Sequence, residues 1–262
     1  MGVLNVTPDS FSDGGRFLDV GQAVAHALKM EEEQADIIDI GGESSRPGAD
    51  PVSEEEECRR VIPVIEGIRK ISDILISIDT VKAGVARAAL QAGADWINDI
   101  SGLRNDSDMV QVAAEWQCPV IIMHMQNTPK TMQINPYYND VVKEIAQFFR
   151  ERLKALASQG INKCILDPGI GFGKRLEDNI ALIKHIGTFK QLGYPILLGS
   201  SRKSFLGTIT GRDVSQRLAA TLSVNLMALQ NNVDIVRVHC VAEHRDMIKI
   251  FNLFTRGSHH DH

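Results

Sequence analysis

The stretch Leu166-Asp-Pro-Gly-Ile-Gly-Phe-Gly-Lys174 is the part of this chain that best predicts its fold. It follows a short apolar run, Cys164–Leu166, and precedes a segment of helical composition, which indicates the loop between a strand and a helix. The loop holds a carboxylate, an aromatic ring and a lysine on glycine-rich backbone. Such a combination suits a flat heterocycle that carries hydrogen-bonding groups along its edge.

Other strand-like runs also end in polar residues, namely Val3-Leu4-Asn5, Ile78-Asp79 and Ile97-Asn98-Asp99. Asp39 lies one residue before the end of a further run. Polar groups repeated at strand ends predict one pocket assembled from several loops.

Eight apolar runs rich in β-branched residues predict strands, and their continuous apolar character is typical of parallel strands buried on both faces. They are 2–6, 36–40, 75–78, 96–100, 120–125, 164–166, 196–198 and 235–239. Helical segments are expected at 20–34, 53–71, 81–92, 107–116, 140–158, 177–191, 215–230 and 242–254. Ser53 and Glu56 predict a capping box at the second of these. Eight βα units in residues 1–255 predict an α/β fold, a single (β/α)8 TIM barrel with an outer ring of helices.

An open, doubly wound sheet is the structural alternative, and it would require a reversal of strand order. No low-complexity linker divides the chain, so one domain is expected. The irregular segment 126–137 predicts a functional or mobile loop. Residues 256–262 are expected to form a disordered tail, either natural or added to the chain.

The composition is that of an ordinary globular protein, with 44% hydrophobic and 23% charged residues. The formal net charge of -5 argues against nucleic acid or an anionic membrane as the main partner. Four widely spaced cysteines argue against a zinc site or a disulfide framework and favour a reducing cytoplasm. No apolar stretch approaches the ~18 residues of a membrane span, and the N-terminus has no signal-peptide pattern.

Seven motifs follow one another at the spacing of barrel loops: GVLNVTPDSFSDGG at 2–15, GGESSRPG at 41–48, SIDT at 77–80, NDI at 98–100, LDPGIGFGK at 166–174, SRKS at 201–204 and RVH at 237–239. Together they closely resemble the dihydropteroate synthases of the folate pathway, and the resemblance covers nearly the whole chain. It implies that the amine of p-aminobenzoate displaces pyrophosphate from 6-hydroxymethyl-7,8-dihydropterin pyrophosphate, with magnesium, to give 7,8-dihydropteroate. It also implies a homodimer and competition of sulfonamides for the p-aminobenzoate position.

Pterin binding is expected from Asp79, Asn98, Met123, Asp167, Phe172, Gly199 and Lys203. Asp167 is the principal candidate, because one carboxylate can accept two adjacent N–H groups of the pterin edge. Met123 and Phe172 would supply apolar walls. From the residues alone, Asp167 could equally cap a turn before Pro168, and Asp79 and Asn98 could be helix N-caps.

Pyrophosphate is expected to bind Arg237 and His239, which lie two residues apart on the eighth predicted strand and so point to the same side. Arg46 and Asn5 are expected to join them, and the Asn5 amide oxygen suits Mg²⁺, which also binds substrate phosphates. Charge stabilisation on the leaving group would lower the barrier. A surface or interdomain ion pair is the alternative for Arg237, and a satisfied structural histidine is the alternative for His239.

Catalysis is assigned to Asp79, Asp167, Lys203, Arg237 and His239. By resemblance, p-aminobenzoate contacts Phe11, Ser45, Pro47, Phe172, Lys203 and Ser204, while Asp13 and Arg46 order the loops. Gly14-Gly15 can serve as the hinge of a lid over the second substrate. A plain surface loop is the alternative.

No His–carboxylate or Ser–His pairing in these motifs is placed to deprotonate the attacking amine. We therefore take a dissociative displacement as the hypothesis. The electron-rich dihydropterin shares positive charge at its exocyclic CH2 as pyrophosphate leaves, and the neutral amine then attacks.

The chain departs from the family pattern at three places. Cys240 stands where the family commonly has aspartate, which affects local hydrogen bonding and is not expected to supply a catalytic thiol. Ser45 replaces the usual threonine, so p-aminobenzoate is expected to pack slightly more loosely. The chain also begins four residues before Asn5, and a shorter N-terminus is expected to cost stability more than chemistry.

Two competing functions share parts of this pattern. A pterin-dependent methyltransferase domain would have less reason to keep Ser201–Ser204, Arg237 and His239 as a phosphate-binding set. A catalytically silent pterin-binding subunit should have lost part of that set, which this chain retains.

Overall fold

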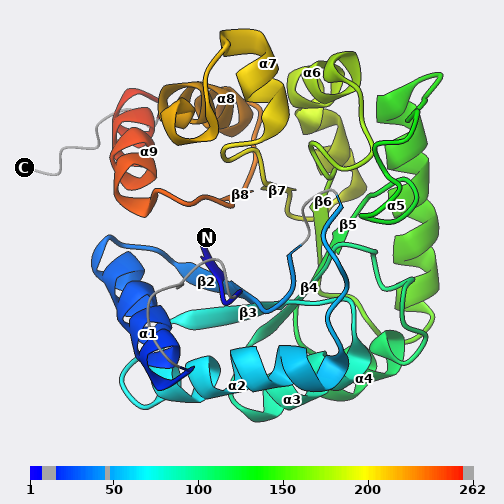
Figure 1. Ribbon diagram of the computed structural model, residues 1–262. Coiled ribbons are helices and arrows are strands. Elements are labelled where there is room, and N and C mark those ends of the chain that lie inside the picture. Colours follow the sequence, from blue (N-terminus) through cyan, green and yellow to red (C-terminus); the bar gives the residue numbers. More distant parts are fainter. Residues whose placement is uncertain (8–15, 45–47, 256–262) are drawn as a thin grey trace, which may run out of the picture.

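Short parallel strands alternate with helices along the chain, as Figure 1 shows for the computed structural model. The structure describes residues 1–7, 16–44 and 48–255, with the side chains of 16–19 left aside. The strands are β1 (Gly2–Asn5), β2 (Ile37–Gly41), β3 (Leu75–Asp79), β4 (Trp96–Asp99), β5 (Val120–Met123), β6 (Cys164–Asp167), β7 (Leu197–Leu198) and β8 (Ile235–Val236). The α-helices are α1 (Arg16–Glu32), α2 (Glu54–Arg69), α3 (Ala83–Gln91), α4 (Met109–Trp116), α5 (Val141–Ala157), α6 (Leu176–Lys184), α7 (Ser204–Thr210), α8 (Leu218–Gln230) and α9 (Val241–Thr255).

The strands close into a ring, which confirms the barrel and excludes the open sheet. Strands β1 to β6 pair in sequence order, and β7 pairs with β8. Single parallel bridges join the two parts, Leu166 with Ile196 and Gly2 with Val238. Backbone bonds reinforce both seams, from the Leu166 amide to the Pro195 carbonyl at 2.9 Å and from the Val3 amide to the Val238 carbonyl at 3.0 Å. Each strand of the described residues therefore has a neighbour on both sides, which leaves no edge at which the strand order could reverse.

The structure differs from the sequence-based prediction mainly in its last third. Strands β7 and β8 are shorter than predicted, with regular pairing limited to two residues each. Helix α7 was missed, because Ser-Phe-Leu-Gly-Thr-Ile-Thr contains a glycine and three β-branched residues, which are poor helix formers. The predicted helix 177–191 is divided into α6 and a 3-10 helix, Ile186–Leu192, whose second residue is Gly187. The predicted helix 215–230 begins only at Leu218.

The predicted N-cap at Ser53 is confirmed. Its hydroxyl accepts from the Glu56 amide at 3.2 Å. The Glu56 carboxylate, which was expected to complete the capping box, instead accepts from Arg60 Nε at 2.9 Å. The predicted irregular segment 126–137 contains no helix or strand.

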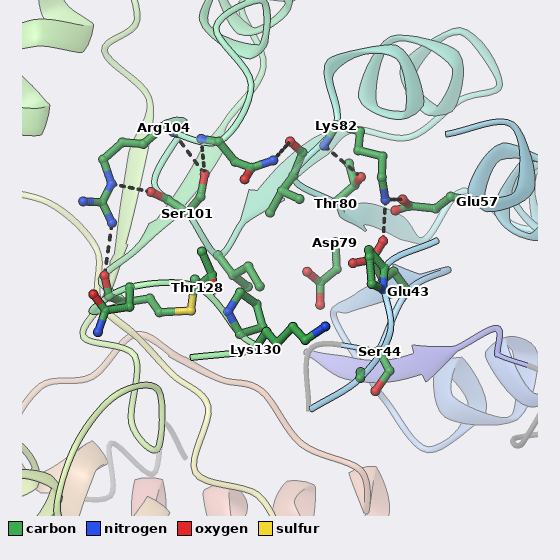
Figure 2. A pocket seen from close by; sticks show the side chains of 18 residues that line it. Glu43, Ser44, Glu57, Asp79, Thr80, Lys82, Ser101, Arg104, Thr128 and Lys130 are labelled. Carbon is green, nitrogen blue, oxygen red and sulfur yellow. Dashed lines mark hydrogen bonds and ion pairs between the residues drawn. The ribbon is translucent and has the colours of Figure 1, made fainter. Parts of the chain in front are cut away.

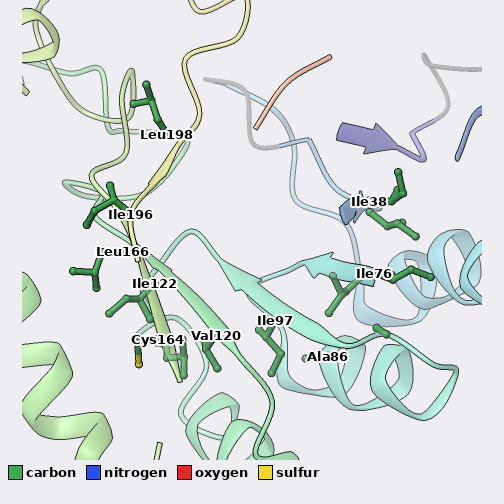
Figure 3. Close-up of a cluster of buried hydrophobic side chains, with 14 of the residues drawn as sticks. Ile38, Ile76, Ala86, Ile97, Val120, Ile122, Cys164, Leu166, Ile196 and Leu198 are labelled. Atoms are coloured by element: carbon green, nitrogen blue, oxygen red, sulfur yellow. The ribbon is translucent and has the colours of Figure 1, made fainter. Parts of the chain in front are cut away.

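The core lies on both faces of the ring, as expected for strands with continuous apolar sequence. Outward-facing side chains such as Ile38, Ile97 and Leu166 pack against the surrounding helices (Figure 3). Their sequence neighbours point inward, where Met1, Ile37, Ile121, Ile165 and Leu197 form a separate apolar cluster. This alternation fills the lower barrel with side chains. Within the described residues, no helix has the length and apolar character needed to cross a membrane.

Candidate functional site

The carboxyl ends of the strands form one end of the barrel, which we call the barrel mouth. A layer of polar side chains lies there, next to the inward-facing apolar cluster. Because strand side chains alternate with a period of two, Asp39, Met123 and Asp167 follow the inward-facing Ile37, Ile121 and Ile165 and point inward as well. The strand register places Met123 opposite Asp167 and Asp79 opposite Asn98. The structure thus brings the predicted strand-end residues to one site.

Arg237 is the centre of a buried ionic network at this site. It follows β8 and donates from Nε to Asp39 at 2.5 Å and from its terminal nitrogen to Asp79 at 2.7 Å. The Asn98 side-chain nitrogen also donates to both oxygens of Asp39, at 3.1 and 3.3 Å. Asp39 is fully buried and its charge is compensated by these donors, as a buried carboxylate requires.

The network also shifts proton affinities. Burial raises the pKa of Asp79 to about 7, although Arg237 opposes the shift. Burial disfavours the guanidinium charge of Arg237, but the two carboxylates outweigh this effect and raise its pKa. Arg237 thus forms ion pairs inside the barrel mouth, and not the surface or interdomain pair that was the alternative. Lys82 and Asp108 occupy the N-cap positions of α3 and α4, so Asp79 and Asn98 are not N-caps.

Asp167 combines a turn-capping role with an orientation toward the site. Its Oδ1 accepts from the Gly169 amide at 2.7 Å, as the turn alternative predicted. Its Oδ2 faces Gly199, where an added Cβ would lie 3.9 Å away, so this glycine leaves room beside the carboxylate. Burial raises the pKa of Asp167, while the Gly169 amide and Lys203 counteract the shift.

The loop after Asp167 is built on left-handed backbone. Gly169, Gly171 and Gly173 have φ angles of +69°, +80° and +61°, which favour glycine. At Gly169 a Cβ would lie 2.0 Å from the His124 carbonyl oxygen, so this loop packs directly on the loop after β5. The glycine pattern of the sequence therefore serves a close contact between two loops.

Lys203 and Phe172 stack against each other beside Asp167. The Lys203 Nζ lies 3.9 Å from the centre of the Phe172 ring, within the range of a cation–π contact. Burial and the nearby Arg237 lower the pKa of Lys203 to about 8, although Asp167 and Asp79 oppose the shift. Phe172 is buried with Met123, Met125 and Met132, a cluster we call the methionine wall. The predicted apolar surface for a flat ring is therefore present.

His239 lies on the β7 side of the barrel mouth, where its Nδ1 is 2.9 Å from the Ser201 hydroxyl. Its orientation is thus set by a residue of the Ser201–Ser204 motif. Cys240 follows it, and its sulfur accepts from a terminal nitrogen of Arg202 at 3.1 Å. Cys240 thus accepts a hydrogen bond from Arg202 at the position where the family commonly has aspartate. Ser204 is the first residue of α7.

A cavity of about 540 Å³ opens between the loops that follow β2, β3, β4 and β5 (Figure 2). It shares Asp79 with the predicted pterin set, whereas Asp167 and Lys203 come from the other side of the ring. In Figure 2, Lys82 reaches from the β3 side to the carboxylates of Glu43 and Glu57 at the cavity wall. Glu43 also accepts from the Val52 amide at 3.1 Å, so its carboxylate joins both ends of the loop between β2 and α2.

The residues predicted to bind pyrophosphate are only partly described. Asn5 ends β1, beside Gly41 of β2, and its side chain is half-buried. Arg46, together with Phe11, Asp13, Ser45 and Pro47, lies outside the described residues. In the described part of the chain, no three His, Cys, Asp or Glu side chains form a group able to hold a metal ion.

Three residues that organise the site had been given no individual role from the sequence. Asp39 holds Arg237 and Asn98, Ser201 holds His239, and Lys174 joins the loops after β5 and β6. Asp39 had a usable signal, because a charged residue inside an apolar strand requires a partner. Lys174 belongs to the motif at 166–174 and Ser201 to the motif at 201–204, but the residues of other loops that they contact are distant in sequence.

The fold and these side chains define a (β/α)8 barrel protein whose candidate site, of buried charged groups beside an apolar wall, lies at the carboxyl ends of its strands. The sequence profile of the family described as "Pterin binding enzyme" matches residues 1–239. The dihydropteroate synthase of Haemophilus influenzae is 47% identical over 253 residues, which cover 96% of this chain and 92% of that protein. The chain belongs to the dihydropteroate synthase family of pterin-binding enzymes.

Solved structures of that family have the same architecture. The Yersinia pestis dihydropteroate synthase in complex with a sulfonamide drug superimposes with a TM-score of 0.93 at 42% identity, covering 98% of this chain and 94% of that one. The Xanthomonas albilineans enzyme in complex with 7,8-dihydropteroate gives a TM-score of 0.89 at 42% identity, with the same coverage of both chains.

Proposed function

We propose that this chain is a dihydropteroate synthase that condenses 6-hydroxymethyl-7,8-dihydropterin pyrophosphate with p-aminobenzoate, giving 7,8-dihydropteroate and pyrophosphate. The observation that carries the proposal is the convergence of Asp167, Asn98, Lys203 and Arg237 at one barrel mouth in a chain of this family. The related Xanthomonas enzyme binds 7,8-dihydropteroate, and the Yersinia enzyme binds a sulfonamide drug. We extend both ligands to this chain, with sulfonamides as competitors of p-aminobenzoate.

In the proposed complex, the pterin lies against the methionine wall, beside the stacked pair of Lys203 and Phe172. The Asp167 carboxylate accepts from the N–H groups of the pterin edge. Asn98 and Asp79 bind the remaining polar groups, and the ring lies beside Gly199, where even an added Cβ would be 3.9 Å from Asp167 Oδ2. Asp167 and Asn98 are buried at the barrel mouth, and Asp167 Oδ2 faces the space beside Gly199, which supports this assignment.

The pyrophosphate group is assigned to Asn5, Arg46, Arg237 and His239. As the bond from the exocyclic CH2 to the pyrophosphate oxygen breaks, negative charge grows on the leaving group, and Arg237 and His239 stabilise it. The electron-rich dihydropterin shares the positive charge left on the CH2. The amine nitrogen then forms the new C–N bond and releases its proton to water. His239 pairs with Ser201 at 2.9 Å, and we assign this pair to the leaving group and not to deprotonation of the amine.

A divalent metal fits this site as a partner of the substrate, and we propose Mg²⁺. Asn5 supplies an amide oxygen, a ligand that Mg²⁺ accepts, and the described residues offer no cluster that would hold a metal without substrate. When bound, the ion would neutralise charge on the pyrophosphate.

The second substrate, p-aminobenzoate, is assigned to Phe172, Lys203 and Ser204 together with Phe11, Ser45 and Pro47. The ordering of the loops is assigned to Asp13 and Arg46.

We further propose a homodimer, which exposed apolar side chains on α8 and α9 support. Met227, Ile250, Leu253 and Phe254 are 47%, 58%, 60% and 81% exposed. Cys58, Cys118, Cys164 and Cys240 are free thiols, which is consistent with a cytoplasmic location.

The deciding experiment is pyrophosphate release by the purified protein, given the dihydropterin pyrophosphate and Mg²⁺ with and without p-aminobenzoate. We expect release that depends on the amine and yields dihydropteroate. Tight pterin binding without release would instead identify a silent pterin-binding protein.

A further inference from the structure

Lys174 is a buried lysine that the proposed reaction does not use. It is 4% exposed, and within the described part of the chain no carboxylate forms an ion pair with it. Lysine is almost never buried without a partner of opposite charge. Burial lowers its pKa to about 7, with Asp167 opposing the shift and Lys203 adding to it. Placing an amine here therefore costs stability, and a function that offsets this cost is expected.

The contacts of Lys174 show what it holds together. Its Nζ lies 2.9 Å from the Phe172 carbonyl oxygen, 3.2 Å from the His124 carbonyl oxygen and 3.2 Å from His124 Nδ1. An ammonium has three donors, and these three acceptors match them. One acceptor belongs to the loop after β6, and two belong to the loop after β5. Lys174 thus ties the two loops together from beneath.

His124 is held as a neutral acceptor for this contact. Burial, together with the nearby Lys174 and Arg104, lowers the pKa of His124 to about 2. The ring packs edge-on against Phe148, with centroids 4.9 Å apart, and lies 6.0 Å from Tyr138. Tyr138 in turn donates to the Gly173 carbonyl at 3.0 Å. The loop after β6 is therefore fixed at consecutive carbonyls, Phe172 by Lys174 and Gly173 by Tyr138.

The two loops that Lys174 joins carry both sides of the proposed pterin pocket. The loop after β6 begins at Asp167 and carries Phe172, whose ring stacks under Lys203. The loop after β5 begins at Met123 and carries Met125 and Met132 of the methionine wall. A displacement of one loop relative to the other would change the distance between the carboxylate and the apolar wall.

We propose that Lys174 is a positioning residue of the pterin pocket: it sets the spacing between the loop that carries Asp167 and Phe172 and the loop that carries Met125 and Met132, without contacting the ligand. The inference rests on the proposed function, because it takes the ligand to be a flat heterocycle with N–H donors on one edge. The effect of Lys174 is expected mainly on the pterin half of the site. Apart from Phe172, the residues assigned to p-aminobenzoate come from other loops.

The test compares Lys174→Met with Lys174→Gln and with Lys190→Met as the matched control. Lys190 binds Asp234 at 2.7 and 2.9 Å at the opposite end of the barrel, so it is a paired lysine remote from the site. Isothermal titration measures the Kd of dihydropterin pyrophosphate without amine, and steady-state kinetics measure kcat and the KM of p-aminobenzoate. Because small displacements at a binding site have large effects, we expect Lys174→Met to raise the pterin Kd about tenfold or more. The KM of p-aminobenzoate and the saturated kcat should stay within about threefold, and Lys174→Gln, which keeps a donor, should recover part of the affinity.

Several results would overturn the inference. A pterin Kd within about twofold of wild type in folded Lys174→Met would show that the contact does not position the pocket. If Lys190→Met weakened pterin binding equally, the effect of Lys174→Met would be one of general stability. A collapse of saturated kcat would make Lys174 part of the chemistry. If Lys174→Met does not fold, Lys174→Gln and His124→Leu, which removes one acceptor, decide by the same readouts. Binding is measured without turnover, so a wild-type protein that binds pterin but releases no pyrophosphate would refute the proposed function separately.

Discussion

Arg237 and Asp39 are 198 positions apart in the chain, yet their side chains meet at 2.5 Å inside the barrel mouth. Asp39 is fully buried in β2, and Arg237 follows the last strand. The pair therefore joins the first and last parts of the ring at the point where the proposed leaving group binds. With Nε bound to Asp39, a terminal nitrogen of the Arg237 guanidinium donates to Asp79.

Replacing Asp39 by asparagine should disturb both folding and catalysis. The change removes a charged acceptor from Arg237, and hydrogen bonds to charged groups contribute about 2 kcal/mol, so the free energy of unfolding should fall by that order. Urea denaturation measures this, and pyrophosphate release should fall in parallel. Asp36→Asn is the control, because Asp36 is exposed and pairs with Arg245 at 3.5 Å, and it should change stability by less than about 0.5 kcal/mol. Equal effects of the two substitutions would contradict the role given to Asp39.

Arg237→Ala should abolish pyrophosphate-dependent turnover, because the substitution removes the charge that stabilises the leaving group. If the protein only binds pterin, the same variant should leave pterin affinity little changed and there would be no turnover to lose. Turnover assays and titration with dihydropterin pyrophosphate distinguish the two cases. Full activity in the variant would remove Arg237 from the catalytic set.

Asp167→Asn should weaken pterin binding by about 100-fold, since a carboxylate that accepts two N–H groups is replaced by an amide that presents one acceptor and one clashing donor. The Kd of dihydropterin pyrophosphate measures the effect. Asp178→Asn is a control in the same region, because Asp178 accepts from the Arg175 amide at 2.9 Å and caps α6. It should leave the pterin Kd within a few-fold, and comparable losses would place the pterin elsewhere.

The activity on the pterin substrate should depend on pH between about 6 and 9. Burial raises the pKa of Asp79 to about 7, so its charged form is gained as pH rises through that value. Burial lowers the pKa of Lys203 to about 8, so its charged form is lost as pH rises further. A plot of kcat/KM for the pterin substrate should therefore rise toward pH 7 and fall above pH 8. A flat profile over this range would show that neither group needs its charge.

Lys82→Met should destabilise the loop between β2 and α2. Glu57 is 1% exposed and pairs with Lys82, and its Oε1 has no partner in the described residues. Removing the lysine leaves a buried carboxylate uncompensated, which costs about 3 kcal/mol or more. Thermal unfolding measures the loss. Lys143→Met provides the contrast, because the 85% exposed Lys143 pairs with Asp140 at the surface. A Tm unchanged in Lys82→Met would show that Glu57 is stable without its partner.

Metal removal should abolish turnover and leave the fold intact. The described residues hold no cluster of three acidic, histidine or cysteine ligands, so the ion is expected to bind with the substrate phosphates. Treatment with EDTA should stop pyrophosphate release, while the Tm of the free protein should change by less than about 1 °C because nothing is removed from it. A large fall in Tm would instead indicate a metal bound by the protein alone.

Much of the fold and of the site could be predicted from the sequence, because the signals are local. Continuous apolar runs predicted the buried parallel strands, and residues such as Asp167, Asp79 and Asn98 were assigned to the site because strand ends meet at one edge of a barrel. The missed α7 and the shortened β7 and β8 show where local signals fail. In α7, tertiary packing overrides a poor helix propensity, and around β8 single bridges rather than regular pairing close the ring.

The sequence by itself determined the order of the strands and helices, the polar residues that end the strands, and the glycine pattern of the loop after β6. It did so because each depends on periodicity and on the conformational range of single residues. Only the tertiary structure decided which partners those residues have. Closure of the ring creates the ion pair of Arg237 with Asp39 and buries Lys174 between two loops. The pKa shifts of Arg237 and Lys174 follow from that pairing and burial. That closure joins residues far apart in the chain and excludes water from their charges.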